Sequence, residues 1–172
     1  MQIRNFVTST PILVLLAAAG VANTASLNNA DKQFLDMAAK TDMTEAHEGQ
    51  MAENQGTRGD IKSFGQTLVT DHSADYTKLS ELAAKTGVTI PTGINVAQDR
   101  DIVQLEHLTG NQFDHQFTTD EIAAHRRVLA TYKREAKDGH DADVKAYASQ
   151  MIPTLEKHLQ LAEQCAKPEK HS

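Results

Sequence analysis

The sequence contains no tryptophan and only one cysteine, and aromatic residues make up 5% of its 172 residues. Cys165 therefore has no partner for a disulfide within the chain, and the fold has to be stabilised by its core. Gly-rich phosphate loops, a serine nucleophile elbow, Cys-x-x-Cys pairs and aromatic platforms for nucleic acids are also missing. These absences exclude several classes of enzyme and leave no motif that names a reaction.

Positive charge is scarce beyond the first residues. Without Arg4, 16 of the 17 basic residues remain against 23 acidic residues, so residues 23–172 carry a formal charge of −7. No cluster of basic residues is available to bind nucleic acid or anionic lipid. We therefore expect no nucleic-acid partner.

The amino-terminal segment has the pattern of a signal peptide. Arg4 gives the start a positive charge, residues 12–19 are an unbroken apolar run, and small residues up to Ala22 fit a cleavage site. The run is too short to span a bilayer, which needs about 20 apolar residues. We expect residues 1–22 to be removed and 23–30 to form a short linker.

This signal predicts an exported protein of the periplasm. An association with the outer membrane and a partner in the cell envelope are left open, as is the oligomeric state. No later segment is apolar enough to suggest a membrane span in the mature chain.

The remaining sequence has a helical composition, dominated by Ala, Leu, Glu, Lys and Gln. Asp60 and Asp141 are expected to cap helices, and glycines are expected to end them. The expected helices span 31–55, 60–86, 98–108, 111–138 and 141–165. They form one domain over 31–165, followed by a frayed tail over 166–172.

The connections between these helices predict an all-α four-helix bundle. Tight Gly-containing turns join the first two long helices and the last two, so each pair is expected to be antiparallel. The connection over 87–110 is long and carries the short extra helix. One long crossover is typical of ferritin-like bundles. The alternative is a plain up-down bundle in which the short helix covers one end.

Each long helix places one polar residue on its otherwise apolar stripe. All four lie near the middle of their helices, about 18 to 26 Å along helices about 40 Å long. They are therefore expected at one level of the bundle, whichever way each helix runs. The four residues are Glu45, His72, His125 and His158.

A buried carboxylate and three buried imidazoles have to be paired with something, because burying them unpaired is costly. Three arrangements are open. The four side chains could bind one transition-metal ion, and their nitrogen and oxygen donors suit zinc, iron, manganese or copper. A protonated histidine could instead pair with Glu45 in a structural network, or the four groups could line a water-filled pocket for a small ligand.

Other acidic residues near this set are expected to support it. Asp75 follows His72 by three residues and is expected to orient its ring through a hydrogen bond. Glu121, on the same line as His125, is expected to act in the same way. Asp71 points about 100° away from His72 and is expected to pair with another helix.

Two further residues are expected to have structural roles. Asp114 lies too far along its helix to reach the same ion, so it is expected to cap or pair with the short helix. Pro153 removes a backbone hydrogen bond and is expected to kink the last helix before His158. Surface positions are expected for the remaining histidines, which are His47, His107, His115, His140 and His171.

Short pieces of the sequence, taken in order, resemble the bacterial family called "domain of unknown function 4142". The resemblance covers residues 31–162. Its pieces are Phe34-Leu35, Ala38-Ala39, Glu45 and Met51-Ala52; Phe64-Gly65, Val69 and Asp71-His72; Leu79 and Leu82-Ala83; Gly110, Phe113-Asp114, Phe117 and His125; and Pro153, Leu155 and His158-Leu159.

The resemblance implies a ferritin-like fold and an envelope location, but no activity. The wider ferritin-like group often binds two metals through Glu-x-x-His pairs. Here Val69 precedes His72 by three residues and Leu155 precedes His158 by three, and neither can bind a metal. A single-metal site, or none, is the expectation.

Three functions are consistent with the sequence. The first is an envelope protein that binds a metal or small ligand without turnover. The second is a structural or interaction module with a polar core. The third is a metal-dependent redox enzyme. The sequence does not predict an enzyme.

Overall fold

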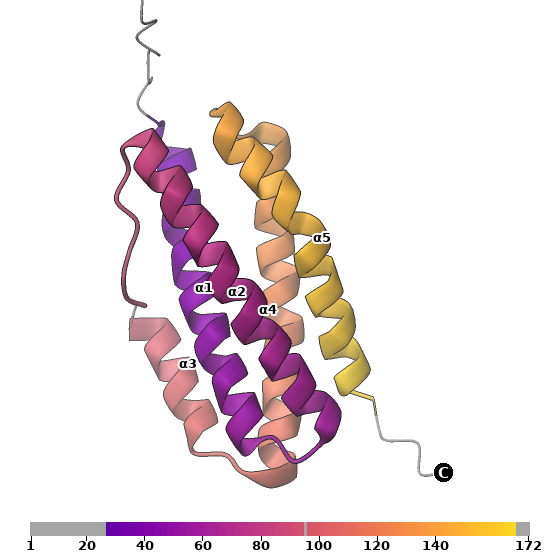
Figure 1. Ribbon diagram of the computed structural model, residues 1–172. Coiled ribbons are helices and arrows are strands. Elements are labelled where there is room, and N and C mark those ends of the chain that lie inside the picture. Colours follow the sequence, from indigo (N-terminus) through magenta and orange to yellow (C-terminus); the bar gives the residue numbers. More distant parts are fainter. Residues whose placement is uncertain (1–26, 95, 168–172) are drawn as a thin grey trace, which may run out of the picture.

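The computed structural model describes residues 27–94 and 96–167 and consists of helices and their connections. The expected signal peptide lies outside the described residues. Each expected helix is present with ends within two residues of the prediction. The helices are α1 (Asn29–Gln55), α2 (Gly59–Thr86), α3 (Val96–Glu106), α4 (Gly110–Asp138) and α5 (Ala142–Cys165) (Figure 1).

Side chains cap the starts of α1 and α5, but not those of α2 and α4. Asn28 caps α1 and Asp141 caps α5, each accepting hydrogen bonds from backbone N–H groups. Gly87 ends α2 in the left-handed conformation, with φ of 69°. The prediction that Asp60 caps α2 is wrong, because Arg58 is the cap residue and makes no capping hydrogen bond with its side chain.

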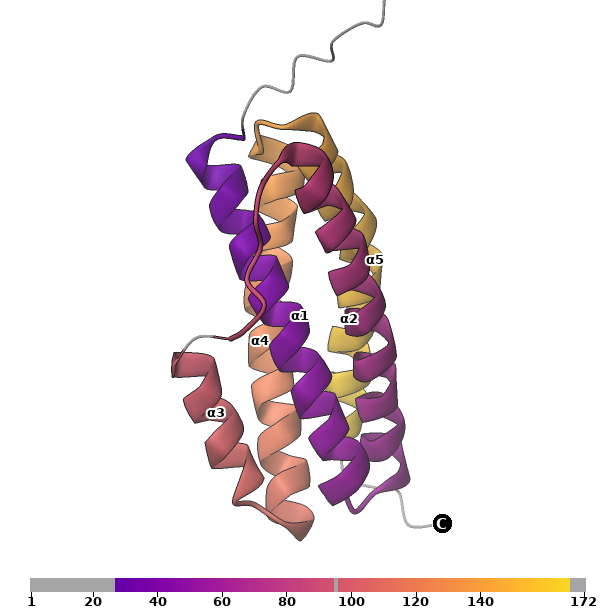
Figure 2. The same cartoon turned by 60° about the vertical axis from the view of Figure 1, so that its left-hand side comes forward.

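The four long helices form a bundle with one long crossover. Helices α1 and α2 pack together as one antiparallel hairpin, and α4 and α5 as another. The chain after α2 returns along the bundle, so that α4 starts at the end where α2 starts (Figure 2). Helices α2 and α4 therefore run in the same direction, which excludes the plain up-down alternative.

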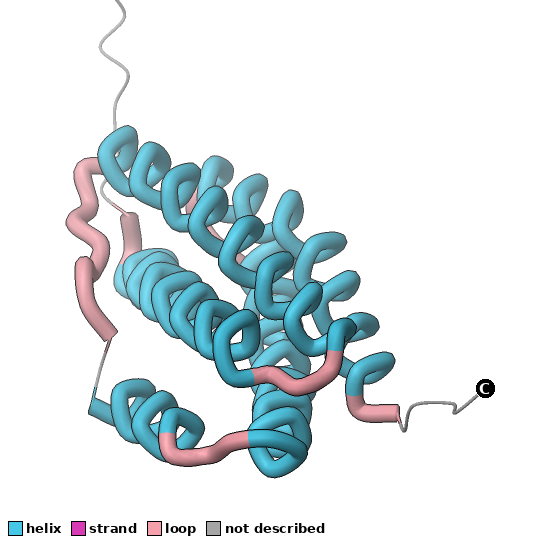
Figure 3. Tube along the Cα trace, turned by 60° about the horizontal axis from the view of Figure 1, so that its bottom comes forward, coloured by secondary structure: helices cyan, strands magenta, loops and turns pink. Residues whose placement is uncertain are grey.

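The short helix lies outside the bundle. Figure 3 shows α3 beside the end at which α4 begins, and α3 contacts both α1 and α4. The two hairpins meet through α1 with α4 and through α2 with α5. The predicted all-α bundle, with a short helix in its long crossover, is confirmed.

The core is divided into two apolar clusters. One surrounds Phe34, Leu79 and Tyr132, and the other surrounds Phe64 and Phe117. Along every long helix, the mid-helix polar residue lies between members of the two clusters. A polar layer therefore separates the two halves of the core.

Two glycines allow α1 and α2 to approach closely. A Cβ atom built on Gly65 would lie 2.5 Å from the carbonyl oxygen of Gly49 and 2.8 Å from Cβ of Ala52. A Cβ atom on Gly49 would lie 2.6 Å from the carbonyl oxygen of Gly65. These distances are too short for real side chains, so the backbones of α1 and α2 can only touch here because both residues are glycine.

We predict that Gly65→Ala lowers the free energy of unfolding by about 1–3 kcal/mol, because the added methyl group overpacks the contact between α1 and α2. Urea denaturation followed by circular dichroism measures this loss. Gly59→Ala is the matched control, because a Cβ atom there meets nothing within 4 Å. Equal stability of the two variants would contradict the proposed close contact.

Candidate metal centre

The four mid-helix residues meet in the centre of the bundle. Glu45 comes from α1, His72 from α2, His125 from α4 and His158 from α5, and none is more than 3% exposed. The three imidazole centroids lie 5.2 to 6.1 Å apart. One nitrogen from each ring lies within 4.8 Å of the other two.

Each imidazole uses its outer nitrogen in a hydrogen bond to an oxygen of the surrounding protein. The three pairs are His72 Nδ1 with Asp42 Oδ1 at 2.9 Å, His125 Nδ1 with the carbonyl oxygen of Glu121 at 3.0 Å, and His158 Nε2 with Asp71 Oδ2 at 2.9 Å. The Glu121 carbonyl can only accept, so it fixes the proton of His125 on the outer nitrogen. Asp42 and Asp71 do the same for the other two rings when they are ionised, and burial raises the pKa of Asp42 well above its ordinary value.

The inner nitrogens have no hydrogen-bond partner in the described part of the chain. They are Nε2 of His72, Nε2 of His125 and Nδ1 of His158. With its outer nitrogen protonated, each ring directs a free lone pair inward. An outer hydrogen bond combined with an inner lone pair is the usual arrangement of metal-binding histidines.

Two carboxylates form a second group, which shares only His125 with the three imidazoles. Glu45 and Glu121 each place an oxygen within 4.8 Å of a ring nitrogen of His125 and of each other. Glu45 Oε2 and both carboxylate oxygens of Glu121 have no hydrogen-bond partner among the described residues, although His125 Nδ1 lies 3.2 Å from Glu121 Oε2. Glu121, expected only to orient a ligand, thus lies among the atoms that could bind an ion.

Burial keeps the imidazoles neutral. It lowers the pKa of His72 and His125, and it lowers the pKa of His158 to about 4. Neutral rings are the form that binds metal ions, so all three are ready as ligands at pH 7.

The two carboxylates shift in opposite directions. Burial opposes ionisation of Glu45, but His125 and His72 outweigh it and lower its pKa. Burial, followed by the charges of Glu45 and Glu48, raises the pKa of Glu121 well above its ordinary value. Glu45 is therefore the ionised member of the pair.

Asp42, and not Asp75 as expected, forms the hydrogen bond to the ring of His72. The ring of His72 is held by Asp42, whereas Asp75 Oδ2 accepts a hydrogen bond from the Tyr147 hydroxyl at 2.8 Å. Asp42 lies four residues after Ala38 and three before Glu45, on the buried stripe of α1. That spacing was the signal that could have identified it.

The other expected residues occupy different parts of the bundle. Asp71 joins α2 to α5 through His158. Asp114 accepts hydrogen bonds from the backbone N–H and the hydroxyl of Thr57, so it holds the turn between α1 and α2. The expectation that Asp114 pairs with the short helix is therefore wrong, because its carboxylate points toward that turn.

Pro153 and the histidines outside the centre remain to be compared with their expected positions. Pro153 lies inside α5, which continues through it, and the kink stays a prediction. The described histidines outside the centre are exposed, namely His47, His107, His115 and His140, and His171 lies outside the described residues.

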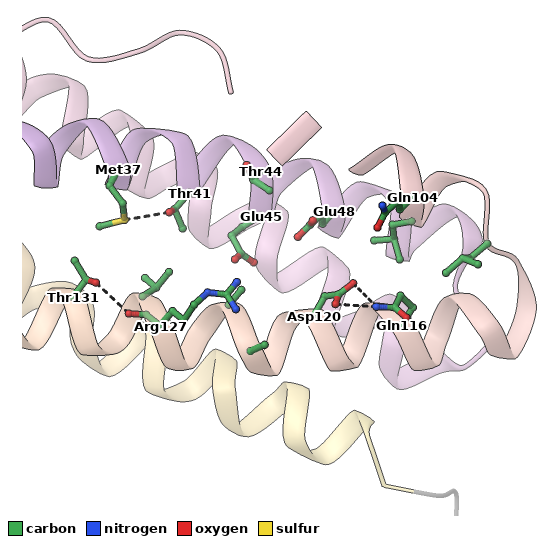
Figure 4. Close-up of a pocket in the computed structure, with 15 residues that line it drawn as sticks. Met37, Thr41, Thr44, Glu45, Glu48, Gln104, Gln116, Asp120, Arg127 and Thr131 are labelled. Carbon is green, nitrogen blue, oxygen red and sulfur yellow. Dashed lines mark hydrogen bonds between the residues drawn. The ribbon is translucent and has the colours of Figure 1, made fainter. Parts of the chain in front are cut away.

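A pocket of about 720 Å³ extends from the surface to Glu45. It lies between α1, α3 and α4, and Figure 4 shows Glu45 and Glu48 on one wall with Asp120 and Arg127 on the other. The rest of the lining consists of three threonines, two glutamines and six apolar residues. The pocket thus reaches the centre at Glu45, whereas Glu121 and the three imidazoles do not line it.

Comparison with known proteins identifies a family and similar folds, but no activity. A family model described as "Domain of unknown function (DUF4142)" matches residues 16–165. No curated protein matches the chain.

Two solved structures are similar. The crystal structure of a DUF305 fragment from Deinococcus radiodurans has 13% identity and a TM-score of 0.71, over 83% of this chain and 98% of that one. A conserved hypothetical protein, rv2844, from Mycobacterium tuberculosis has 12% identity and a TM-score of 0.63, over 83% and 96%. At these identities the likeness concerns the fold alone.

We predict that Asp75→Asn stabilises the metal-free protein at pH 8 and has little effect at pH 4. Burial and the charge of Asp42 raise the pKa of Asp75 to about 7, so the folded state holds this proton more tightly than the unfolded state does. The wild type therefore loses stability as the pH rises from about 4 to about 7. Asparagine does not titrate, and its amide oxygen can still accept the Tyr147 hydrogen bond.

Thermal unfolding followed by circular dichroism at both pH values measures the difference. We expect Tm to rise by about 2–4 °C at pH 8. Asp138→Asn, at an exposed position in the last turn of α4, is the control. A gain that is the same at both pH values would contradict the assignment of a buried acid at Asp75.

Proposed function

We propose that this chain, which belongs to the DUF4142 family, is an exported protein of the cell envelope that binds one transition-metal ion in the centre of its bundle and catalyses no reaction. The proposed ligands are His72, His125 and His158, with Glu45 as the fourth. Glu121 lies close enough to replace or assist Glu45.

One observation carries this proposal, namely the convergence of three buried nitrogens that have no hydrogen-bond partner among the described residues. Leaving a buried acceptor unsatisfied costs about 1–3 kcal/mol. Three such costs at one point, beside an ionised carboxylate, are explained most simply by a cation that accepts all the lone pairs.

The donor set narrows the choice of ion. Three imidazoles and a carboxylate supply nitrogen and oxygen but no sulfur, which suits zinc, iron, manganese or copper. Ligand atoms about 2 Å from a common ion lie about 3.3 Å apart in a tetrahedron. One nitrogen of each ring lies within 4.8 Å of the other two, so binding requires the rings to move closer together.

A purely structural polar network fits the charges less well. In such a network a protonated histidine would have to balance Glu45, but burial lowers the pKa of all three imidazoles. The rings are then neutral at pH 7, and ionised Glu45 is left with the protonated carboxyl of Glu121, which can supply a hydrogen bond but no positive charge. A bound cation supplies the missing positive charge.

Export is supported by the sequence. The charged start, the apolar run over 12–19 and the small residues before Ala22 are the parts of a cleavable signal. We therefore propose the periplasm as the location of the protein. None of the described helices is long and apolar enough to cross a membrane.

The metal site is tested by loading purified, tag-free protein. We predict one equivalent of bound metal by native mass spectrometry for at least one of zinc, iron, manganese and copper. His158→Gln should weaken binding at least about 100-fold, because glutamine can still donate to Asp71 but offers no imidazole lone pair. His47→Gln, exposed on α1, is the matched control.

Two results would contradict the site. One is wild-type protein that takes up none of the four metals, and the other is equal binding by both variants. In the first case, replacing His72, His125 and His158 together with leucine tests the structural alternative. A triple variant that folds stably, and that gives cells the same phenotype as the wild-type chain does, would assign the polar layer to packing.

The hydrogen bond between the outer nitrogen of His158 and Asp71 leads to a separate prediction. Asp71 is 32% exposed and accepts from His158, so its substitution leaves the core intact. Asp71→Asn should weaken metal binding by about tenfold, because a neutral amide oxygen polarises the imidazole less than a carboxylate does. Competition titration with a chromophoric chelator measures the change, and an unchanged affinity would show that the His158–Asp71 contact does not support the ligand.

A further inference from the structure

The pocket beside Glu45 has a charge pattern that the proposed metal site alone does not explain. Its lining includes three acidic residues, Glu45, Glu48 and Asp120, and one basic residue, Arg127. With all three acids ionised, the lining carries a formal charge of −2. A negatively charged cavity wall favours binding of a positively charged ligand.

The acidic residues are ordered by depth. Asp120 is exposed, Glu48 is 8% exposed, Glu45 is 3% exposed, and Glu121 behind them is fully buried. Glu45 and Glu121 lie within 4.8 Å of a nitrogen of His125. The acids that line the pocket thus range from exposed to almost fully buried, and the most buried of them, Glu45, lies beside His125.

Packing closes the centre above and below, and on the α2–α5 side His158 is hydrogen-bonded to Asp71, which is 32% exposed. Each imidazole is at most 3% exposed, and apolar clusters cover the layer above and below. Figure 4 shows that the pocket side is different, with Glu45 and Glu48 facing Asp120 and Arg127 across the space between α1 and α4. An ion that reaches the imidazoles has to pass a side of the bundle, and this side offers oxygen ligands.

We propose that the pocket is the entry route for a divalent metal cation, which Glu48 and Glu45 bind before the three imidazoles do. This inference rests on the proposed metal site. In this role Asp120 attracts the cation at the surface, Glu48 holds it on the way, and Arg127 limits the rate of entry by repulsion.

The route predicts opposite effects of opposite charges. Co²⁺ is a suitable probe, because its visible absorption changes when imidazoles bind it. In stopped-flow mixing of metal-free protein with Co²⁺ at low salt, Glu48→Gln and Asp120→Asn should slow loading by about two- to tenfold. Arg127→Gln should accelerate loading by a similar factor. Final absorption and equilibrium affinity should change much less than the rates do.

Two variants keep the test interpretable. Asp120 is exposed on α4, so Asp120→Asn tests the route even where Glu48→Gln unfolds the chain. Glu81→Gln, exposed on α2 and outside the pocket, controls for a general change in net charge. Raising the ionic strength should reduce the differences, because screening weakens the attraction.

The outcomes separate the inference from the site on which it rests. Loading rates equal to that of Glu81→Gln, with normal equilibrium binding, would overturn the entry route and leave the metal site standing. Slower loading in Arg127→Gln would also overturn it, since removing a positive charge from the wall of an entry route should not slow a cation. Wild-type protein that binds no Co²⁺ at equilibrium, and none of the other metals, would remove both.

Discussion

The structure depends on how a bundle core accommodates a layer of polar groups. Two apolar clusters hold the four helices together, and between them lie three imidazoles, Glu45 and Glu121. Each ring is satisfied on its outer side by an oxygen from the protein and unsatisfied on its inner side. The cost of these inner lone pairs is the physical reason to expect a cation, and a carboxylate-lined route to the layer is consistent with the same need.

Much of this arrangement could be predicted because it depends on local rules. Glycines and capping residues determine where the helices end, and the 3.6-residue period determines which residues face inward. Since Glu45 and the three histidines are near mid-helix, their common level does not depend on the direction of each helix. The length of the segment between Gly87 and Gly110 also predicted the crossover.

The parts that could not be predicted depend on contacts between helices. Whether Asp42 or Asp75 reaches the ring of His72 is decided by the rotation and distance of α1 relative to α2, which the close contact of Gly49 and Gly65 sets. Asp114 reaches Thr57 because the start of α4 lies beside the turn between α1 and α2. Helical periodicity indicates which side of a helix is buried, but not which partner it meets there.

The division of the ligands between the two hairpins has a mechanical consequence. Glu45 and His72 belong to the α1–α2 hairpin, and His125 and His158 to the α4–α5 hairpin. Packing is more extensive within each hairpin than between them. An ion held by all four would act as a cross-link across the seam, the role that disulfides fill in many exported domains, in a chain whose single cysteine cannot make one.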